Sequence, residues 1–168
     1  MEPGIEAFRK LDICSKDDKY WEVFNFALGS HEAISTLYLS SNDGMSSSLK
    51  IPGRHLNDFP TVSFAGTEEV SVKKLSTLLN DAAGNIMLKL DVQGFELEAL
   101  MGIGDALNKI VAIELEMTLI PMYQGEASLG RILVAIEDMG FQLFSISEFG
   151  KGKHGQVSYF DVIAVKSK

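Results

Sequence analysis

Residues 85–102, NIMLKLDVQGFELEALMG, constrain the fold of this chain more than any other stretch. Ile86–Val92 is a short run that is apolar except at Lys89 and Asp91, which is typical of a buried strand in a parallel sheet. A glycine then allows a tight turn, and Phe95–Met101 has the apolar spacing of a helix that packs on a sheet. In open α/β sheets, ligands bind outside the carboxyl ends of the strands. The stretch therefore predicts an α/β fold with a ligand site near Asp91.

Length and composition limit what the rest of the chain can be. The 168 residues predict a single domain, residues 1–168. No apolar run reaches the roughly 18 residues that a membrane-spanning helix needs. Met1 is followed by acidic and polar residues rather than by a signal peptide, and Cys14 is the only cysteine, which fits a reducing compartment. We therefore expect a cytoplasmic protein without a membrane partner.

The charged residues exclude several kinds of site. The formal net charge is −8, and the 15 Lys and Arg residues form no long block, which argues against nucleic acid as a partner. His31, His55 and His154 are far apart in the sequence and lack metal-ligand spacing, so we expect no metal site. There is also no G-x-S-x-G turn to support hydrolase chemistry.

Apolar periodicity predicts the remaining elements. Strands are expected at residues 20–28, 34–39, 69–72, 109–116, 141–146 and 159–165, and helices at residues 5–11, 71–79 and 129–136. Residues 40–48, SSNDGMSSS, have the composition of a loop. The last two strands form a hairpin and are therefore antiparallel. The order of elements predicts an α/β fold whose sheet is mostly parallel with an antiparallel C-terminal hairpin.

These residues resemble a known family, the FkbM-type S-adenosylmethionine-dependent methyltransferases. The family pattern of lysine, apolar, Asp, apolar, Glu or Gln, Gly, any residue and Glu is matched by Lys89, Asp91, Gln93, Gly94 and Glu96. Further pieces that resemble the family in the same order are MEPGIEAFRKL at residues 1–11, SSSL at 46–49, IVAIELEMTLIPMYQGE at 110–126, LGRILVAIEDMGFQLFSI at 129–146 and SYFDVIAVK at 158–166.

The resemblance implies a Rossmann-like methyltransferase sheet and S-adenosylmethionine as the cofactor. The implied reaction is methylation of a small-molecule or sugar hydroxyl by direct displacement. Family members begin with a strand and a glycine-rich loop that hold the methionine part of the cofactor, and neither precedes Glu2. We therefore expect an N-terminally truncated form of the fold. Two alternatives stay open, namely a truncated or inactive domain that binds no cofactor, and a nucleotide-dependent oxidoreductase, although G-x-G-x-x-G is absent.

Candidate catalytic residues lie at the ends of two neighbouring strands. Asp91 can face the sulfonium cation or accept the proton of an attacking hydroxyl, and its alternative role is to cap backbone amides. Lys89, two residues earlier, can pair with Asp91 and keep it ionised. Glu114 and Glu116 share one face of the next strand, so one of them can line the same crevice. We predict that Asp91, Glu114 and Lys89 are catalytic and that Glu116 binds the substrate.

Candidate binding residues surround these carboxylates. Glu2 follows the position of the second family strand, where an acidic residue binds ribose hydroxyls, although a chain terminus often frays. We predict that Glu2, Asp91 and Gln93 bind the cofactor. Glu96 and Tyr123 are predicted to contact the substrate, and Glu96 can instead complement the dipole of the helix that it begins.

Overall fold

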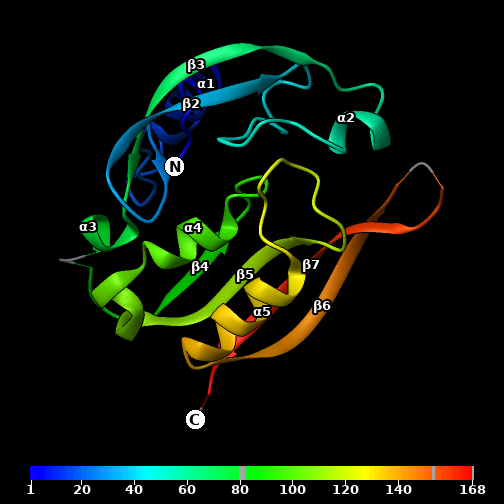
Figure 1. Cartoon of the computed structure of the whole chain (residues 1–168). Coiled ribbons are helices and arrows are strands. Elements are labelled where there is room, and N and C mark those ends of the chain that lie inside the picture. The colour runs from blue at the N-terminus through cyan, green and yellow to red at the C-terminus, as the bar shows by residue number, and fades with distance from the viewer. Residues whose placement is uncertain (80–81, 153, 168) are drawn as a thin grey trace.

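Two β-sheets occupy the upper and lower halves of the computed structural model in Figure 1, which describes residues 1–79, 82–152 and 154–167. One sheet has the strand order β4-β5-β7-β6. β4 and β5 are parallel, whereas β7 is antiparallel to both β5 and β6. The strand bounds are Ile86–Leu90 for β4, Ile110–Thr118 for β5, Phe141–Lys151 for β6 and Val157–Lys166 for β7.

Helices cover one face of this four-stranded sheet and leave polar groups on the other. Leu88 and Leu90 of β4 are buried in the main core with side chains from α4 (Glu96–Met101), η1 (Gly104–Lys109) and α5 (Leu129–Asp138). Because successive side chains of a strand alternate between faces, the intervening Lys89 points to the other face. Burial of the apolar positions thus fixes which face of the sheet carries the carboxylates.

The other sheet has the strand order β1-β3-β2 and comes from the first half of the chain. Its strands are β1 (Ala27–Leu28), β2 (Ala33–Ser40) and β3 (Phe64–Lys73), and the helices of this half are α1 (Ile5–Ser15), α2 (His55–Asp58) and α3 (Leu75–Leu79). The carboxylate of Glu68 on β3 accepts a hydrogen bond from Ile5 N at 3.0 Å, which fastens the start of α1 to the sheet.

The two sheets approach each other where β1 ends. A side chain at Gly102, which follows α4, would collide with the backbone of Gly29, which follows β1. Gly102 also accepts a hydrogen bond through its carbonyl from Ser76 N of α3 at 3.1 Å. This close approach requires glycine at position 102 and sets the spacing between the sheets.

The structure confirms the α/β class and the antiparallel hairpin but not a mostly parallel sheet. Among the pairings between named strands of the described residues, two are parallel and three are antiparallel. The sheets are mixed because β2 and β3 pair antiparallel and because β7 returns from β6 against β5. The strand expected at residues 20–28 is reduced to Ala27–Leu28, while β3 is longer than expected.

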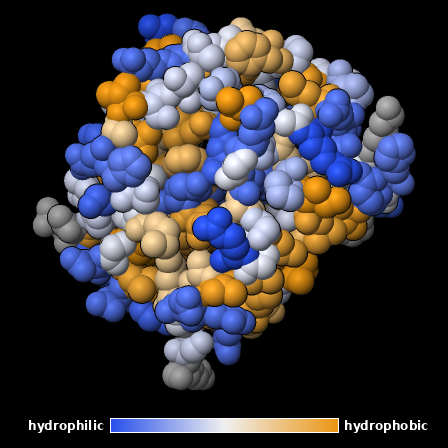
Figure 2. Space-filling model, viewed as in Figure 1, coloured by the Kyte–Doolittle hydropathy of each residue, from blue (hydrophilic) through white to orange (hydrophobic). Residues whose placement is uncertain are grey.

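The surface mixes hydrophobic and hydrophilic residues. Figure 2 shows patches of both kinds on the face that it views. Large exposed apolar side chains include Phe144 and Ile146 on β6, an edge strand of its sheet. Among the helices of the described residues, none combines the length and the apolar character that a membrane span requires.

Candidate functional site

Two pockets meet at the carboxyl end of β4. The first pocket has a volume of about 530 Å³ and is lined by the N-terminal segment, β1, residues 43–49 and the end of β4. The second pocket has a volume of about 350 Å³ and extends toward α2, β5 and the loop that holds Tyr123. Asp91 and Gln93 line both pockets. The structure therefore places the Asp91 region where the strand-end rule puts a ligand site.

The turn after β4 has an unusual backbone. Gln93 and Gly94 both have positive φ, 53° and 89° respectively. Left-handed backbone is unfavourable for a residue with a side chain, so Gln93 must be held by its surroundings. Its carbonyl accepts a hydrogen bond from the buried hydroxyl of Ser48 at 2.7 Å. Gly94 leaves no room for a side chain, because a Cβ there would lie 2.9 Å from the Tyr123 ring.

The side chain of Gln93 connects the two carboxylates of the site. Its Nε2 donates hydrogen bonds to Asp91 Oδ1 at 2.8 Å and to Glu116 Oε1 at 3.2 Å. Its Oε1 accepts a hydrogen bond from the hydroxyl of Tyr123 at 2.7 Å. This assigns the orientation of the amide, with nitrogen toward the carboxylates and oxygen toward the phenol. Gln93 thereby holds Asp91 and Glu116 together at its amide nitrogen.

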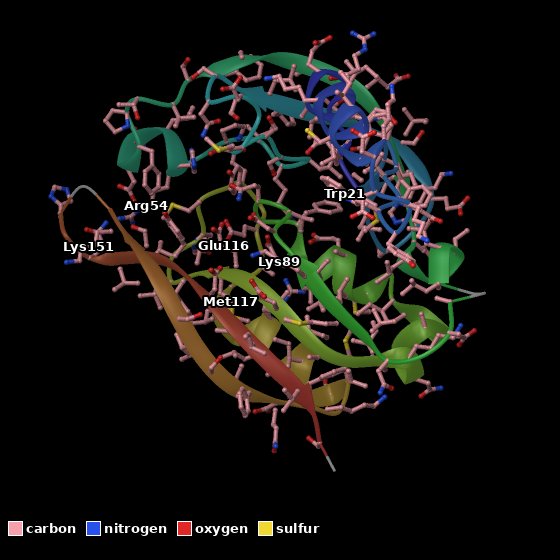
Figure 3. The ribbon with its side chains drawn as sticks, turned by 180° about the vertical axis from the view of Figure 1, so that it is seen from behind. Trp21, Arg54, Lys89, Glu116, Met117 and Lys151 are labelled. Carbon is pink, nitrogen blue, oxygen red and sulfur yellow. The ribbon has the colours of Figure 1, made fainter. Side chains whose placement is uncertain are left out.

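Glu116 is the central carboxylate of the second pocket. It projects from β5 on the face opposite to the helices. Figure 3 labels it in a view from behind that of Figure 1. Burial and the nearby charges of Asp91 and Asp161 together raise the pKa of its carboxyl to about 7, and the hydrogen bond from Gln93 opposes the shift. The carboxyl of Glu116 is therefore half-protonated near neutral pH.

Glu96 lies in the wall of the second pocket and organises its backbone. Its side chain is buried, and its Oε1 accepts hydrogen bonds from Val92 N at 3.3 Å and from Gly94 N at 3.1 Å. Burial raises the pKa of Glu96 to about 7, although these hydrogen bonds act in the opposite direction. The contacts of Glu96 within the chain are those of a group that stabilises the turn after β4.

Tyr123 closes the second pocket from the loop after β5. Glu126 accepts hydrogen bonds from Met122 N at 2.6 Å, from Tyr123 N at 2.9 Å and from the hydroxyl of Thr118, which fixes the loop. Burial and the surrounding carboxylates raise the pKa of the Tyr123 hydroxyl, so it stays protonated and acts as a donor. Its ring stacks on His55, with the centroids 5.5 Å apart.

Lys89 and Glu114 form an ion pair beside the pockets. Lys89 Nζ lies 2.7 Å from Glu114 Oε1, and this contact raises the pKa of Lys89. The predicted partner of Lys89 was Asp91, but the parallel register places Glu114 directly opposite Lys89. Lys89 lines the first pocket, whereas Glu114 appears in the lining of neither. The structure thus places Lys89 in the wall of the first pocket and Glu114 outside the walls of both pockets.

Glu2 lines the first pocket and not the second. Its backbone N–H donates a hydrogen bond to Phe24 O at 3.0 Å, and its Oε1 accepts one from Gly4 N at 2.9 Å. Burial raises the pKa of this carboxyl. Glu2 is therefore held in place by the chain around it and lines the same pocket as Asp91.

Sequence reasoning missed part of the site. His55 lines the second pocket, and burial lowers the pKa of its imidazole, which favours the neutral ring. Phe59 and Tyr159 continue an aromatic wall, with ring centroids 5.0 Å apart for His55 and Phe59 and 6.2 Å apart for Phe59 and Tyr159. No pattern in the sequence marks these residues. The serine run at 46–48 was a detectable signal, but its composition suggested only a loop.

The fold and the site together define a mixed α/β protein whose two pockets meet at the carboxyl end of β4, an edge strand of its sheet. The sequence model described as the methyltransferase FkbM domain matches residues 2–143 of this chain. The chain belongs to the FkbM methyltransferase family, as the resemblance predicted. This membership favours methyltransferase activity over the oxidoreductase alternative. Comparisons with curated proteins and with solved structures gave no match.

Proposed function

We propose that this chain transfers a methyl group from S-adenosylmethionine to a hydroxyl of an uncharged small molecule. The observation that carries the proposal is the junction of the two pockets at Asp91 and Gln93. The donor occupies the first pocket and the acceptor occupies the second. The reacting atoms then meet at the carboxyl end of β4.

The first pocket suits S-adenosylmethionine in size and chemistry. Its volume of about 530 Å³ is within the range of small-molecule sites, roughly 300–1,000 Å³. Phe26, Leu28 and Leu90 give it an apolar wall. Glu2 and Asp91 line this pocket. In the proposed complex Glu2 accepts hydrogen bonds from ribose hydroxyls, and Asp91 supplies negative charge for the cationic end of the cofactor. When bound, S-adenosylmethionine supplies a methyl group that its positive sulfur activates for direct displacement.

The second pocket suits an acceptor without negative charge. Asp91, Glu96 and Glu116 line it, and none of the described residues that line it is Lys or Arg. An anionic acceptor would be repelled by these carboxylates. The aromatic side chains of His55 and Phe59 offer an apolar surface for the body of the molecule. These features support a neutral, hydroxyl-bearing acceptor.

The main contribution of the chain to the rate is alignment. Holding two reactants in a productive geometry can lower a barrier by roughly 7–11 kcal/mol. Gln93 fixes the carboxylates of Asp91 and Glu116 at the junction, and Tyr123 holds Gln93 in turn. Lys89, on the first-pocket side, balances the negative charge of Glu114.

Calorimetric titration with S-adenosylhomocysteine tests the proposal. We expect saturable binding to the wild-type chain. Binding should weaken by about tenfold in Glu2→Gln and in Asp91→Asn, because each variant loses roughly one charge-assisted hydrogen bond. Asp138→Asn, which changes an exposed carboxylate at the end of α5, is the matched control and should bind as the wild type does. No heat from the folded wild-type chain would instead favour a domain that binds no cofactor.

A further inference from the structure

Six carboxylates lie close to the pocket junction. Asp161, opposite Glu116 on β7, lines neither pocket, and three others are committed to partners within the chain. Glu114 is paired with Lys89 at 2.7 Å and lines neither pocket. Glu96 accepts two backbone N–H groups of the turn after β4. Glu126 accepts two backbone N–H groups and a hydroxyl in the loop that holds Tyr123. Asp91 and Glu116 remain as groups that can react with a bound molecule.

The two remaining carboxylates differ in which pocket they serve. Asp91 is exposed at the rim and lines both pockets, so it faces the donor as well as the acceptor. Glu116 lines the second pocket alone. Gln93 anchors Oε1 of Glu116, and within the described part of the chain no hydrogen bond to Oε2 is found. Glu116 therefore has one oxygen that is fixed and one that can meet the acceptor.

We propose that Glu116 is the catalytic base of the acceptor pocket and that Gln93 is the residue that positions it. This inference rests on the proposed methyl transfer and assigns the proton acceptor within it. The acceptor hydroxyl gives its proton to Glu116 while its oxygen forms a bond to the methyl carbon. The carbon–sulfur bond breaks, and its electron pair stays on sulfur. Glu116 then releases the proton to solvent.

The groups around Glu116 match its basicity to this task. Asp91 faces it from the turn after β4, Asp161 lies opposite it on β7, and Glu126 and Tyr123 face it from the following loop. The carboxylates among them and burial together raise the pKa of Glu116 to about 7. A base is most effective when its pKa lies near the working pH.

Two small nucleophiles distinguish a base from a merely structural residue. Cyclohexanol must lose its proton on the enzyme, whereas para-nitrothiophenol is already ionised at neutral pH. With Glu116→Gln, methyl transfer to cyclohexanol should fall by about 10²–10⁴-fold. Transfer to the thiolate should not fall, because the thiolate needs no base and the variant removes one of the carboxylates that repel an anion. Glu69→Gln, at an exposed position on β3, is the control for a lost carboxylate. The proposal is overturned if Glu116→Gln affects both nucleophiles alike, or if Glu114→Gln shows this selective loss.

A titration that needs no acceptor gives a second test. Carboxyl carbon signals of labelled glutamate, with Glu116 assigned through Glu116→Gln, should show a midpoint near pH 7 for this residue. Asp161→Asn removes a neighbouring negative charge and should move the midpoint to lower pH. A midpoint at the ordinary glutamate value would overturn the proposal. Failure of the proposed function is distinguishable, because it appears as absent S-adenosylhomocysteine binding.

Discussion

Tyr123 and Gln93, thirty positions apart in the chain, are joined by a hydrogen bond of 2.7 Å from the phenol hydroxyl to the amide oxygen. This contact crosses from the loop after β5 to the turn after β4. It leaves the amide nitrogen of Gln93 facing Asp91 and Glu116. The orientation of the two carboxylates therefore depends on Tyr123. Among the described residues, Tyr123 forms no hydrogen bond to either carboxylate and acts through Gln93.

Removing the Tyr123 hydroxyl should weaken the hydrogen bonds at the pocket junction while the ring stays in place. Tyr123→Phe keeps the ring that stacks on His55 but leaves the Gln93 amide oxygen without its donor. We expect the free energy of unfolding to fall by about 1 kcal/mol, since a partly buried acceptor loses its partner. Urea denaturation measures the change. Tyr20→Phe, at a side chain that is 85% exposed, is the matched control and should change stability by less than about 0.5 kcal/mol. Equal effects of the two substitutions would contradict this account.

The turn after β4 offers a second test, at Gly94. Gly94→Ala combines two costs, because its φ is 89° and its Cβ would lie 2.9 Å from the Tyr123 ring. Gly125→Ala carries only the first cost, since φ is 72° there and nothing lies within 4 Å of its Cβ. We expect Gly125→Ala to lower stability by about 1–2 kcal/mol and Gly94→Ala by about 1–3 kcal/mol more. Thermal denaturation of the pair checks this order, and equal melting temperatures would refute the packing role of Gly94.

The sequence was sufficient to predict the central unit of the site. A short apolar run interrupted at alternate positions predicts a strand with Lys89 and Asp91 on one face, and the structure has β4 there, with Asp91 just beyond its end. The signal is strong because local periodicity and the turn glycine agree. Strand-end placement and the family resemblance together led to the prediction of Asp91, Gln93, Glu96, Glu116 and Tyr123, all of which line the second pocket.

Pairings between strands were harder to predict because they depend on register and not on local pattern. Lys89 was expected beside Asp91, but the parallel register of β4 and β5 sets Glu114 opposite it. The antiparallel pairing of β2 with β3 likewise depends on how residues 41–63 return the chain. Composition indicated a loop at residues 40–48 and was ambiguous from residue 50 onward. His55 belongs to the same segment and lines the second pocket. Its backbone N–H donates a hydrogen bond to Met122 O at 3.1 Å.

Lys50 links this segment to the rest of the site and carries a third prediction. Its Nζ lies 2.7 Å from both Glu98 Oε1 of α4 and Gly125 O of the Tyr123 loop, and its side chain is only 10% exposed. Lys50→Met should lower the free energy of unfolding by about 2–3 kcal/mol, because the partially buried Glu98 loses its cation. Lys10→Met breaks an exposed pair with Asp43 and should cost less than about 1 kcal/mol. Chemical denaturation of both variants tests the difference, and a Lys50→Met protein as stable as Lys10→Met would rule it out.

Burial of Glu96 should make the stability of the chain depend on pH. In the folded state burial raises its pKa to about 7, whereas in the unfolded chain it titrates near 4.5. Between these values the folded state binds more protons, so the free energy of unfolding falls as the pH rises through this window. The part due to Glu96 is on the order of 3 kcal/mol and is complete above pH 7.

Glu96→Gln isolates this contribution, because the amide oxygen can still accept the N–H groups of Val92 and Gly94 without a buried charge. Urea denaturation from pH 5 to pH 8 should show a smaller decline in the variant than in the wild type. Glu116 titrates in the same window, so Glu116→Gln should remove a separate part of the decline of similar size, since its pKa is raised to the same value. Glu6→Gln, on the exposed face of α1, should leave the pH dependence unchanged. An undiminished decline in Glu96→Gln would mean that the folded chain holds this carboxylate ionised, because the two N–H groups of the turn then outweigh its burial.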